Sequence, residues 1–137
     1  MVQSKQQGKG VIEIRPEEID DFDLQVKRFQ AGEWNETEFQ AFRLKQGIYG
    51  QRQTDAQMVR VKVPFGGLTA EMMDVLGEAS AQFAPLNKGH VTTRENVQFH
   101  HVKLEDTPDF MRLLASSGLT TREACGNTVR NVTGCPL

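Results

Sequence analysis

The sequence has few cysteines and no long hydrophobic run. Its 137 residues include two cysteines, Cys125 and Cys135. With no CxxC pair, they predict reduced thiols and no metal site in the chain. No apolar stretch approaches the roughly 18 residues that span a bilayer, and the polar first eight residues do not resemble a secretory signal. We therefore predict a cytoplasmic protein without membrane association.

Charge is distributed unevenly behind a net value of -2. Residues 11–40 carry nine acidic and three basic side chains, whereas residues 43–103 carry eight basic and five acidic ones. One interpretation is two ordinary solvated surfaces. The other is a basic body that collects an anionic ligand. Charge alone does not decide between them.

The first 55 residues are predicted to form an N-terminal arm. Residues 1–10 are polar and rich in glycine, glutamine and lysine, which favours disorder. Pro16 and the acidic residues that follow it predict a helix that ends at Gly32. A second helix is expected from Asn35 to about Gln46.

Residues 56–137 are predicted to form a ferredoxin-like half-domain. The valines at 59, 61 and 63 alternate with Arg60 and Lys62, which indicates a half-buried strand with a cationic outer face. A helix capped by Thr69 follows, then strands over residues 90–93 and 96–103, a helix with a hydroxyl cap at Thr107, and a possible last strand over 128–132. This β-α-β-β-α-β order is typical of an α+β fold, an antiparallel sheet with both helices on one face.

The face of the sheet away from the helices must be polar, covered by another domain or occupied by a ligand. Arg60 and Lys62 are expected there, together with Arg94, Gln98 and His100. Arginine suits carboxylate and phosphate oxygens, so these residues favour a polyanionic ligand, although incidental cations on a solvated face fit equally well. Nucleic-acid binding is not expected, because this face lacks the exposed aromatics on which bases stack.

Strand alternation also places two adjacent histidines. Val97, Phe99 and His101 are expected on the core face, with Gln98 and His100 on the other. His100 and His101 would then point in opposite directions, one toward the helices. They are not expected to share a metal ion.

Four blocks together resemble the nitrite/sulfite reductase family of sirohaem and iron–sulfur enzymes. They are residues 42–52 (FRLKQGIYGQR), 58–67 (MVRVKVPFGG), 91–100 (VTTRENVQFH) and 126–136 (GNTVRNVTGCP). The resemblance covers about residues 40–137. It implies the first ferredoxin-like half-domain of a reductase that converts nitrite to ammonia or sulfite to sulfide in a six-electron reaction.

The resemblance also implies roles for individual residues. Arg60 and Arg130 match arginines that bind the anionic substrate, sulfite or nitrite, and they are the candidate catalytic residues. Six further residues match positions at or near sirohaem, a tetrapyrrole with eight carboxylates: Lys62, Thr92, Arg94, Gln98, His100 and Asn131. His90 departs from relatives that have arginine at that position, which leaves its role open.

The family's 4Fe-4S cluster is not expected on this chain. Its four cysteine ligands belong to the second half of the family's proteins, and Cys125 and Cys135 cannot replace them. The chain alone is expected to be inactive and to need the C-terminal remainder of the reductase and an electron donor protein or subunit. The isolated fragment is expected to be capable of self-association.

Two alternatives stay open. A precorrin-oxidising iron–sulfur enzyme of the same family would keep the fold and change the reaction. A non-catalytic binding or interaction module would use the open face of the sheet to dock a partner.

Overall fold

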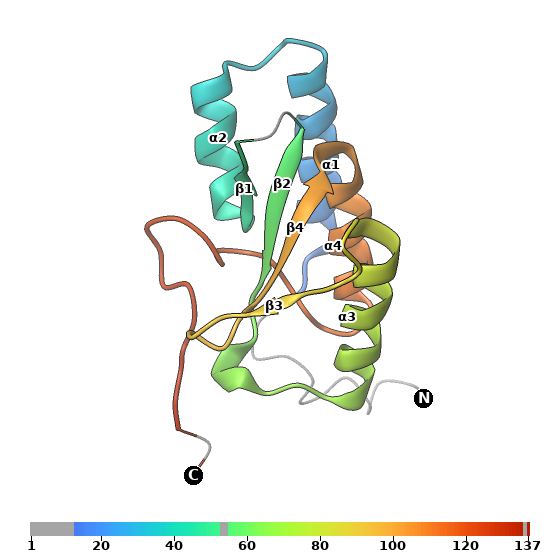
Figure 1. Ribbon diagram of the computed structural model, residues 1–137. Helices are drawn as coiled ribbons and strands as arrows, with labels where there is room; N and C mark the ends of the chain where they lie inside the picture. Colours follow the sequence, from blue (N-terminus) through green and yellow to red (C-terminus); the bar gives the residue numbers. More distant parts are fainter. Residues whose placement is uncertain (1–12, 53–54, 136) are drawn as a thin grey trace, which may run out of the picture.

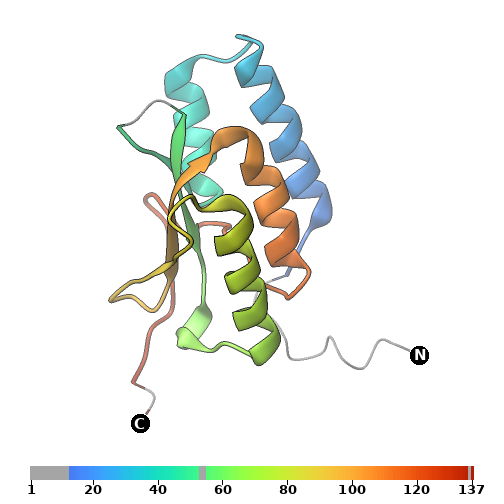
Figure 2. The same cartoon turned by 45° about the vertical axis from the view of Figure 1, so that its right-hand side comes forward.

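An antiparallel sheet separates a layer of helices from an irregular C-terminal segment, residues 124–135 (Figures 1 and 2). The computed structural model describes residues 13–52, 55–135 and 137. The predicted disorder of residues 1–10 lies outside these residues. The elements are α1 (Pro16–Gln30), α2 (Glu36–Lys45), β1 (Ile48–Gly50), β2 (Ala56–Val61), η2 (Pro64–Gly66), α3 (Ala70–Phe83), β3 (His90–Val91), β4 (Val97–Lys103), η3 (Leu104–Asp106) and α4 (Thr107–Ala115).

Local capping signals explain where most helices begin. Pro16 starts α1, with acidic residues in its first turn. The side chains of Asn35 and Thr69 accept hydrogen bonds from backbone N–H groups at the starts of α2 and α3. The predicted hydroxyl cap at Thr107 is wrong. Thr107 is the first residue of α4, and its Oγ1 donates to the Leu104 carbonyl at 2.7 Å, which joins the helix to η3.

The fold class is confirmed, but the source of one strand was predicted wrongly. The sheet order is β1-β2-β4-β3, with every neighbouring pair antiparallel. The edge beside β2 is occupied by β1, whereas residues 128–132 form no strand. Side chains from other parts of the fold bond to the backbone of these residues instead: Lys62 Nζ, just after β2, donates to the Val129 carbonyl. The division of the chain after residue 55 stays a prediction, although β1 and β2 pair across it.

A bulge in β4 overturns the predicted alternation at His101. Gln57 pairs with Val102 and Val59 with Phe99, so two residues of β4 oppose one of β2. His101 has a φ of 61°. Val102 takes the buried position that was expected for His101. His100 and His101 are both half-buried, with ring centroids 6.3 Å apart. The prediction that one of them packs against the helices is therefore wrong.

The core lies between the sheet and the helices. Val59, Val61 and Phe99 point into it, and Phe99 meets Phe110 of α4 edge-on at 5.2 Å between centroids. Phe22 of α1 is also fully buried in the same cluster. In the part of the chain that the structure describes, no helix is long and apolar enough to cross a membrane.

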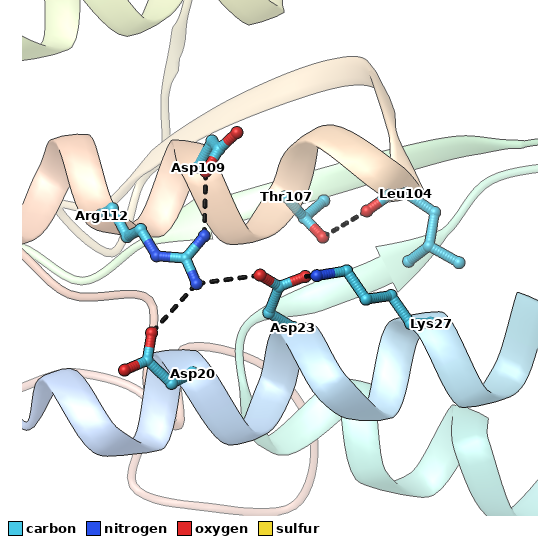
Figure 3. A network of polar contacts seen from close by, with 7 residues as sticks. All are labelled: Asp20, Asp23, Lys27, Leu104, Thr107, Asp109 and Arg112. Carbon is cyan, nitrogen blue, oxygen red and sulfur yellow. Dashed lines mark hydrogen bonds and ion pairs between the residues drawn. The ribbon is translucent and has the colours of Figure 1, made fainter.

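An ion-pair network fastens α1 to α4 at the surface (Figure 3). The Arg112 guanidinium contacts Asp23 at 2.9 Å, Asp20 at 3.0 Å and Asp109 at 2.9 Å. The hydrogen bond to Asp23 is the main reason why the pKa of Arg112 is raised. Burial alone would raise the pKa of Asp23, but hydrogen bonds from Arg112 and Lys27 outweigh burial and lower it.

We expect Arg112→Met to lower the free energy of unfolding by about 0.5–1 kcal/mol at neutral pH and low salt, because the pairs are solvent-screened but form a network. A carboxyl whose pKa falls on folding stabilises the fold above its unfolded pKa of about 3.9 and loses that contribution as pH falls. The difference between wild type and variant should therefore shrink near pH 3. Urea unfolding measures both values.

The matched control is Arg28→Met. It removes an exposed arginine of α1 whose ion-pair partner, Glu33, lies just after the same helix, so this pair does not join two helices. We expect this control to change stability by less than about 0.5 kcal/mol. Equal effects of the two variants would show that the Arg112 network does not fasten α1 to α4.

Candidate functional site

A pocket on the sheet face away from the helices collects three arginines from three separate segments. Arg60 comes from β2, Arg94 from the β3–β4 turn and Arg130 from the C-terminal segment. The pocket has a volume of about 220 Å³. Five predicted site residues line it: Arg60, Thr92, Arg94, Gln98 and Arg130.

Arg60 is oriented from two sides. It pairs across the strands with Gln98, and with the Gln98 amide turned so that its oxygen faces Arg60, that oxygen accepts from Nε at 3.0 Å and from Nη2 at 2.7 Å. The Arg60 Nη1 donates to the Ala124 carbonyl at 3.3 Å. These contacts hold the guanidinium in place and leave other N–H groups for a ligand.

The β3–β4 turn presents Arg94 and Thr92. Glu95 adopts a φ of 65°, and its N–H donates to the Thr92 carbonyl at 3.0 Å. The Thr92 hydroxyl accepts from the Asn96 N–H at 3.1 Å, which braces the turn. Arg94 Nη2 donates to the Asn131 carbonyl at 3.3 Å.

Two pocket residues, Thr93 and Asn96, were missed by the sequence interpretation. Both flank the Arg94-Glu95 turn, so the predicted tight turn was the signal that pointed to them. Asn96 is buried, and its Oδ1 accepts from the Val63 N–H at 3.0 Å, which ties the turn to the end of β2.

Lys62, His100 and Asn131 lie outside the pocket lining. The expected exposed position of Lys62 is wrong, because the C-terminal segment covers it and leaves it 8% exposed. Its Nζ donates to the Val129 carbonyl at 3.3 Å. Burial lowers the pKa of Lys62, and Arg122 lowers it further, against an opposing effect of Glu123.

His100 lies in a second hollow, about 180 Å³, beside Lys88 and His90. Its Nδ1 is 3.3 Å from the Nε2 of Gln51. Burial lowers the pKa of His100, and the neighbouring His101 and His90 lower it further. The neutral imidazole is therefore favoured in the folded chain.

The lowered pKa of His100 predicts a pH dependence of stability. The unfolded chain binds a proton at this residue at a higher pH, near 6.5, than the folded chain does, so stability rises with pH through this window. We expect His100→Gln to weaken the loss of stability between pH 7.5 and 5.5, measured by urea unfolding. Identical pH profiles of wild type and variant would contradict this assignment.

The pocket carries positive charge without a counterion of its own. Within residues 13–52, 55–135 and 137, no carboxylate forms an ion pair with Arg60, Arg94 or Arg130. Guanidinium groups present planar forks that match carboxylate and other oxyanions. The arrangement is suited to binding a polyanion or a small oxyanion.

The cysteines do not form a metal centre in the described residues. Cys125 is buried and Cys135 exposed, and both are free thiols. Burial raises the pKa of the Cys125 thiol, against opposing effects of Arg60 and Arg130. Across the described ranges, no three histidine, cysteine or acidic side chains converge as metal ligands would.

Residues 49–117 match the sequence profile of the nitrite/sulfite reductase ferredoxin-like half domain. The chain belongs to this family. The family resemblance and the ferredoxin-like fold predicted from the sequence are thereby confirmed. Six of the predicted site residues lie inside the matched range, whereas Arg130 and Asn131 lie beyond it.

Curated relatives are reductases of two kinds. The chain is 40% identical over 80 residues to sulfite reductase [ferredoxin] 1 of Mycolicibacterium paratuberculosis, covering 58% of this chain and 14% of that protein. It is 36% identical over 80 residues to the ferredoxin–nitrite reductase of Leptolyngbya laminosa, covering 58% of this chain and 16% of the relative. The chain thus spans a small part of the relatives it matches.

A solved structure supports the same family assignment. The chain is similar to the Mycobacterium tuberculosis NirA protein, with a TM-score of 0.73, 26% sequence identity, and coverage of 90% of this chain and 26% of that one. The structural likeness therefore extends well beyond the 80 residues of the sequence matches. At 90% coverage, the likeness takes in most of the chain, beyond the residues that the family profile matches.

Proposed function

We propose that this chain supplies the polyanion-binding face of a sirohaem-dependent nitrite or sulfite reductase. The reaction is the six-electron reduction of nitrite to ammonia or of sulfite to sulfide. The observation that carries the proposal is the convergence of Arg60, Arg94 and Arg130 in one pocket whose lining, among the residues that the structure describes, includes no carboxylate. Family membership supports the same conclusion.

The donor set fits sirohaem, whose eight carboxylates require cationic and amide partners. Arg94, Thr92 and Gln98 are placed along the β3–β4 hairpin, where they would hold carboxylates at one edge of the macrocycle. Lys62, His100 and Asn131 lie outside the pocket lining, so a direct role for them beside the macrocycle rests on the family resemblance alone. Sirohaem, when bound, supplies the electron-transfer chemistry at its iron.

Arg60 and Arg130 are assigned to the small anion. Their guanidinium groups would bind the oxygens of nitrite or sulfite and stabilise negative charge on them during reduction. Gln98 keeps Arg60 in a fixed orientation through the two contacts to one amide oxygen. A fixed donor does not have to reorganise when charge develops.

The 4Fe-4S cluster does not fit this chain. The cluster needs four thiolates, whereas the chain has two cysteines, one of them buried with a raised pKa. We assign no step through the cluster to these residues. The remainder of the reductase would hold the cluster, and an electron donor protein, a ferredoxin in the names of the relatives, would deliver electrons in the cytoplasm.

Titration of the chain with sirohaem tests the proposal, with absorbance as the readout and haem b, which has two carboxylates, as the control ligand. We expect sirohaem to bind at least about tenfold more tightly, because more charge-assisted hydrogen bonds form. Added salt should weaken its binding. Equal affinity for the two macrocycles, or no binding of sirohaem, would contradict the proposal.

A further inference from the structure

The C-terminal segment crosses the polar face of the sheet without joining its ladder. Figure 2 shows it on the side opposite α1, α3 and α4. Over residues 124–135 it contains no helix or strand. Its position is therefore set by individual contacts, and these contacts decide where Arg130 lies.

The buried side chain of Asn131 makes two of these contacts. It is 5% exposed, and its Nδ2 donates to the Val63 carbonyl and to the Arg94 carbonyl, each at 2.9 Å. Both amide hydrogens are used, one just after β2 and one in the β3–β4 turn. Arg94 Nη2 returns a bond to the Asn131 carbonyl at 3.3 Å.

The residues on either side of Arg130 are fixed, whereas Arg130 itself is exposed. The Val129 carbonyl accepts from Lys62 Nζ at 3.3 Å, and Asn131 anchors the next residue. One residue further on, the Val132 carbonyl accepts from the Phe65 N–H at 2.8 Å. The backbone at residue 130 is thus held between two anchors while its side chain reaches the pocket.

We propose that Asn131 is a positioning residue: its amide clamps the C-terminal segment to β2 and to the β3–β4 turn and thereby places Arg130 in the pocket beside Arg60 and Arg94. This inference rests on the proposed function and refines the part of Asn131 in it. Asn131 acts through Arg130, with its amide hydrogens committed to the protein. A flexible segment would lose entropy on each anion-binding event, and the clamp removes that cost in advance.

The clamp is testable on the 137-residue chain without a ligand. We compare Asn131→Ala with Asn127→Ala, an exposed asparagine of the same segment, by ¹⁵N relaxation of the Arg130 backbone amide. The order parameter of Arg130 should fall below about 0.6, the range of flexible backbone, in Asn131→Ala and stay unchanged in Asn127→Ala. An Arg130 amide that remains as ordered as in wild type overturns the inference.

Anion binding provides the second readout, with sulfite titrated under argon as the probe. Asn131→Ala should weaken sulfite binding about as much as Arg130→Ala, and it should add less than about twofold in the Arg130→Ala background. An equal loss in both backgrounds means that Asn131 acts independently of Arg130 and overturns the clamp. Asn131→Leu, which keeps the side-chain shape, loses both donated hydrogen bonds and adds no charge, gives the same comparison if the alanine variant does not fold.

The two proposals fail in different ways. If Arg130→Ala leaves sulfite affinity unchanged, the anion-binding role of Arg130 is wrong, and the relaxation measurement still decides the clamp. If Arg130→Ala weakens sulfite binding and Asn131→Ala does not, the clamp alone is wrong.

Discussion

Gly47→Ala should lower the free energy of unfolding by about 2–4 kcal/mol, because it combines backbone strain with overpacking. Gly47 has a φ of 77°, in the region that favours glycine. A Cβ there would clash with the Thr121 carbonyl and lie 2.9 Å from the Arg60 carbonyl. The Arg60 N–H donates to the Gly47 carbonyl at 2.9 Å, so strain at Gly47 acts on the backbone of the pocket residue Arg60.

Gly77→Ala is the matched control for this substitution. Gly77 lies in α3, and nothing is within 4 Å of the position where its Cβ would be built. Alanine should stabilise the helix by about 0.5–1 kcal/mol. Urea unfolding of both variants measures the contrast. A Gly47→Ala protein as stable as wild type would contradict the close packing of Gly47 against the backbone of Thr121 and Arg60.

Arg60→Ala should weaken nitrite or sulfite binding by about tenfold to a hundredfold in the sirohaem-loaded protein that contains this chain. The estimate follows from about 1.5–3 kcal/mol for hydrogen bonds to charged groups. The sirohaem absorbance should be retained, because Arg60 is assigned to the small anion. Arg94→Ala should show the reverse pattern, a loss of bound sirohaem at low concentration.

The control for these variants is Arg28→Ala, an exposed arginine of α1 that is paired with Glu33. It should change neither the absorbance nor the anion affinity. Equal loss of chromophore in Arg60→Ala and Arg94→Ala would show that Arg60 builds the cofactor site. Unchanged anion affinity in Arg60→Ala would remove it from the substrate site.

Local signals were sufficient to predict most of the elements. Proline at the start of α1, and polar caps at Asn35 and Thr69, act within one turn of the helix they begin, so a short stretch of sequence contains them. Period-two alternation likewise located β2 and placed Arg60 on the face opposite the valine core. The pairing of Arg60 with Gln98 then follows from two correctly predicted strands.

The missed features depend on contacts between distant residues. The strand β1 has three residues, too few for a periodic pattern. The bulge at His101 requires a positive φ that a histidine rarely adopts, so alternation failed there. Residues 128–132 were predicted as a possible strand. Their actual contacts, with Lys62 and with the Arg94 carbonyl, involve distant residues and cannot be read from their own composition.

Only part of the candidate site follows from residue patterns. Arg60 and Gln98 could be placed on one face by strand geometry, whereas Arg130 entered through the family resemblance alone. The position of Arg130 in the pocket depends on its neighbour Asn131. The side-chain amide of Asn131 donates to the carbonyl of Arg94, which lies 37 residues away in the sequence. Such a contact lies outside the range of local patterns, and the structure was needed to find it.

The most direct test of the account follows the arginine Nε–Hε signals of the chain by NMR during titration with uroporphyrin, a tetrapyrrole with eight carboxylates. Each signal is assigned by an arginine-to-lysine variant. The account predicts that the signals of Arg60, Arg94 and Arg130 shift together with one dissociation constant, while that of Arg28 stays in place. Separate dissociation constants for the three arginines, or an equal shift at Arg28, would contradict a single polyanion site.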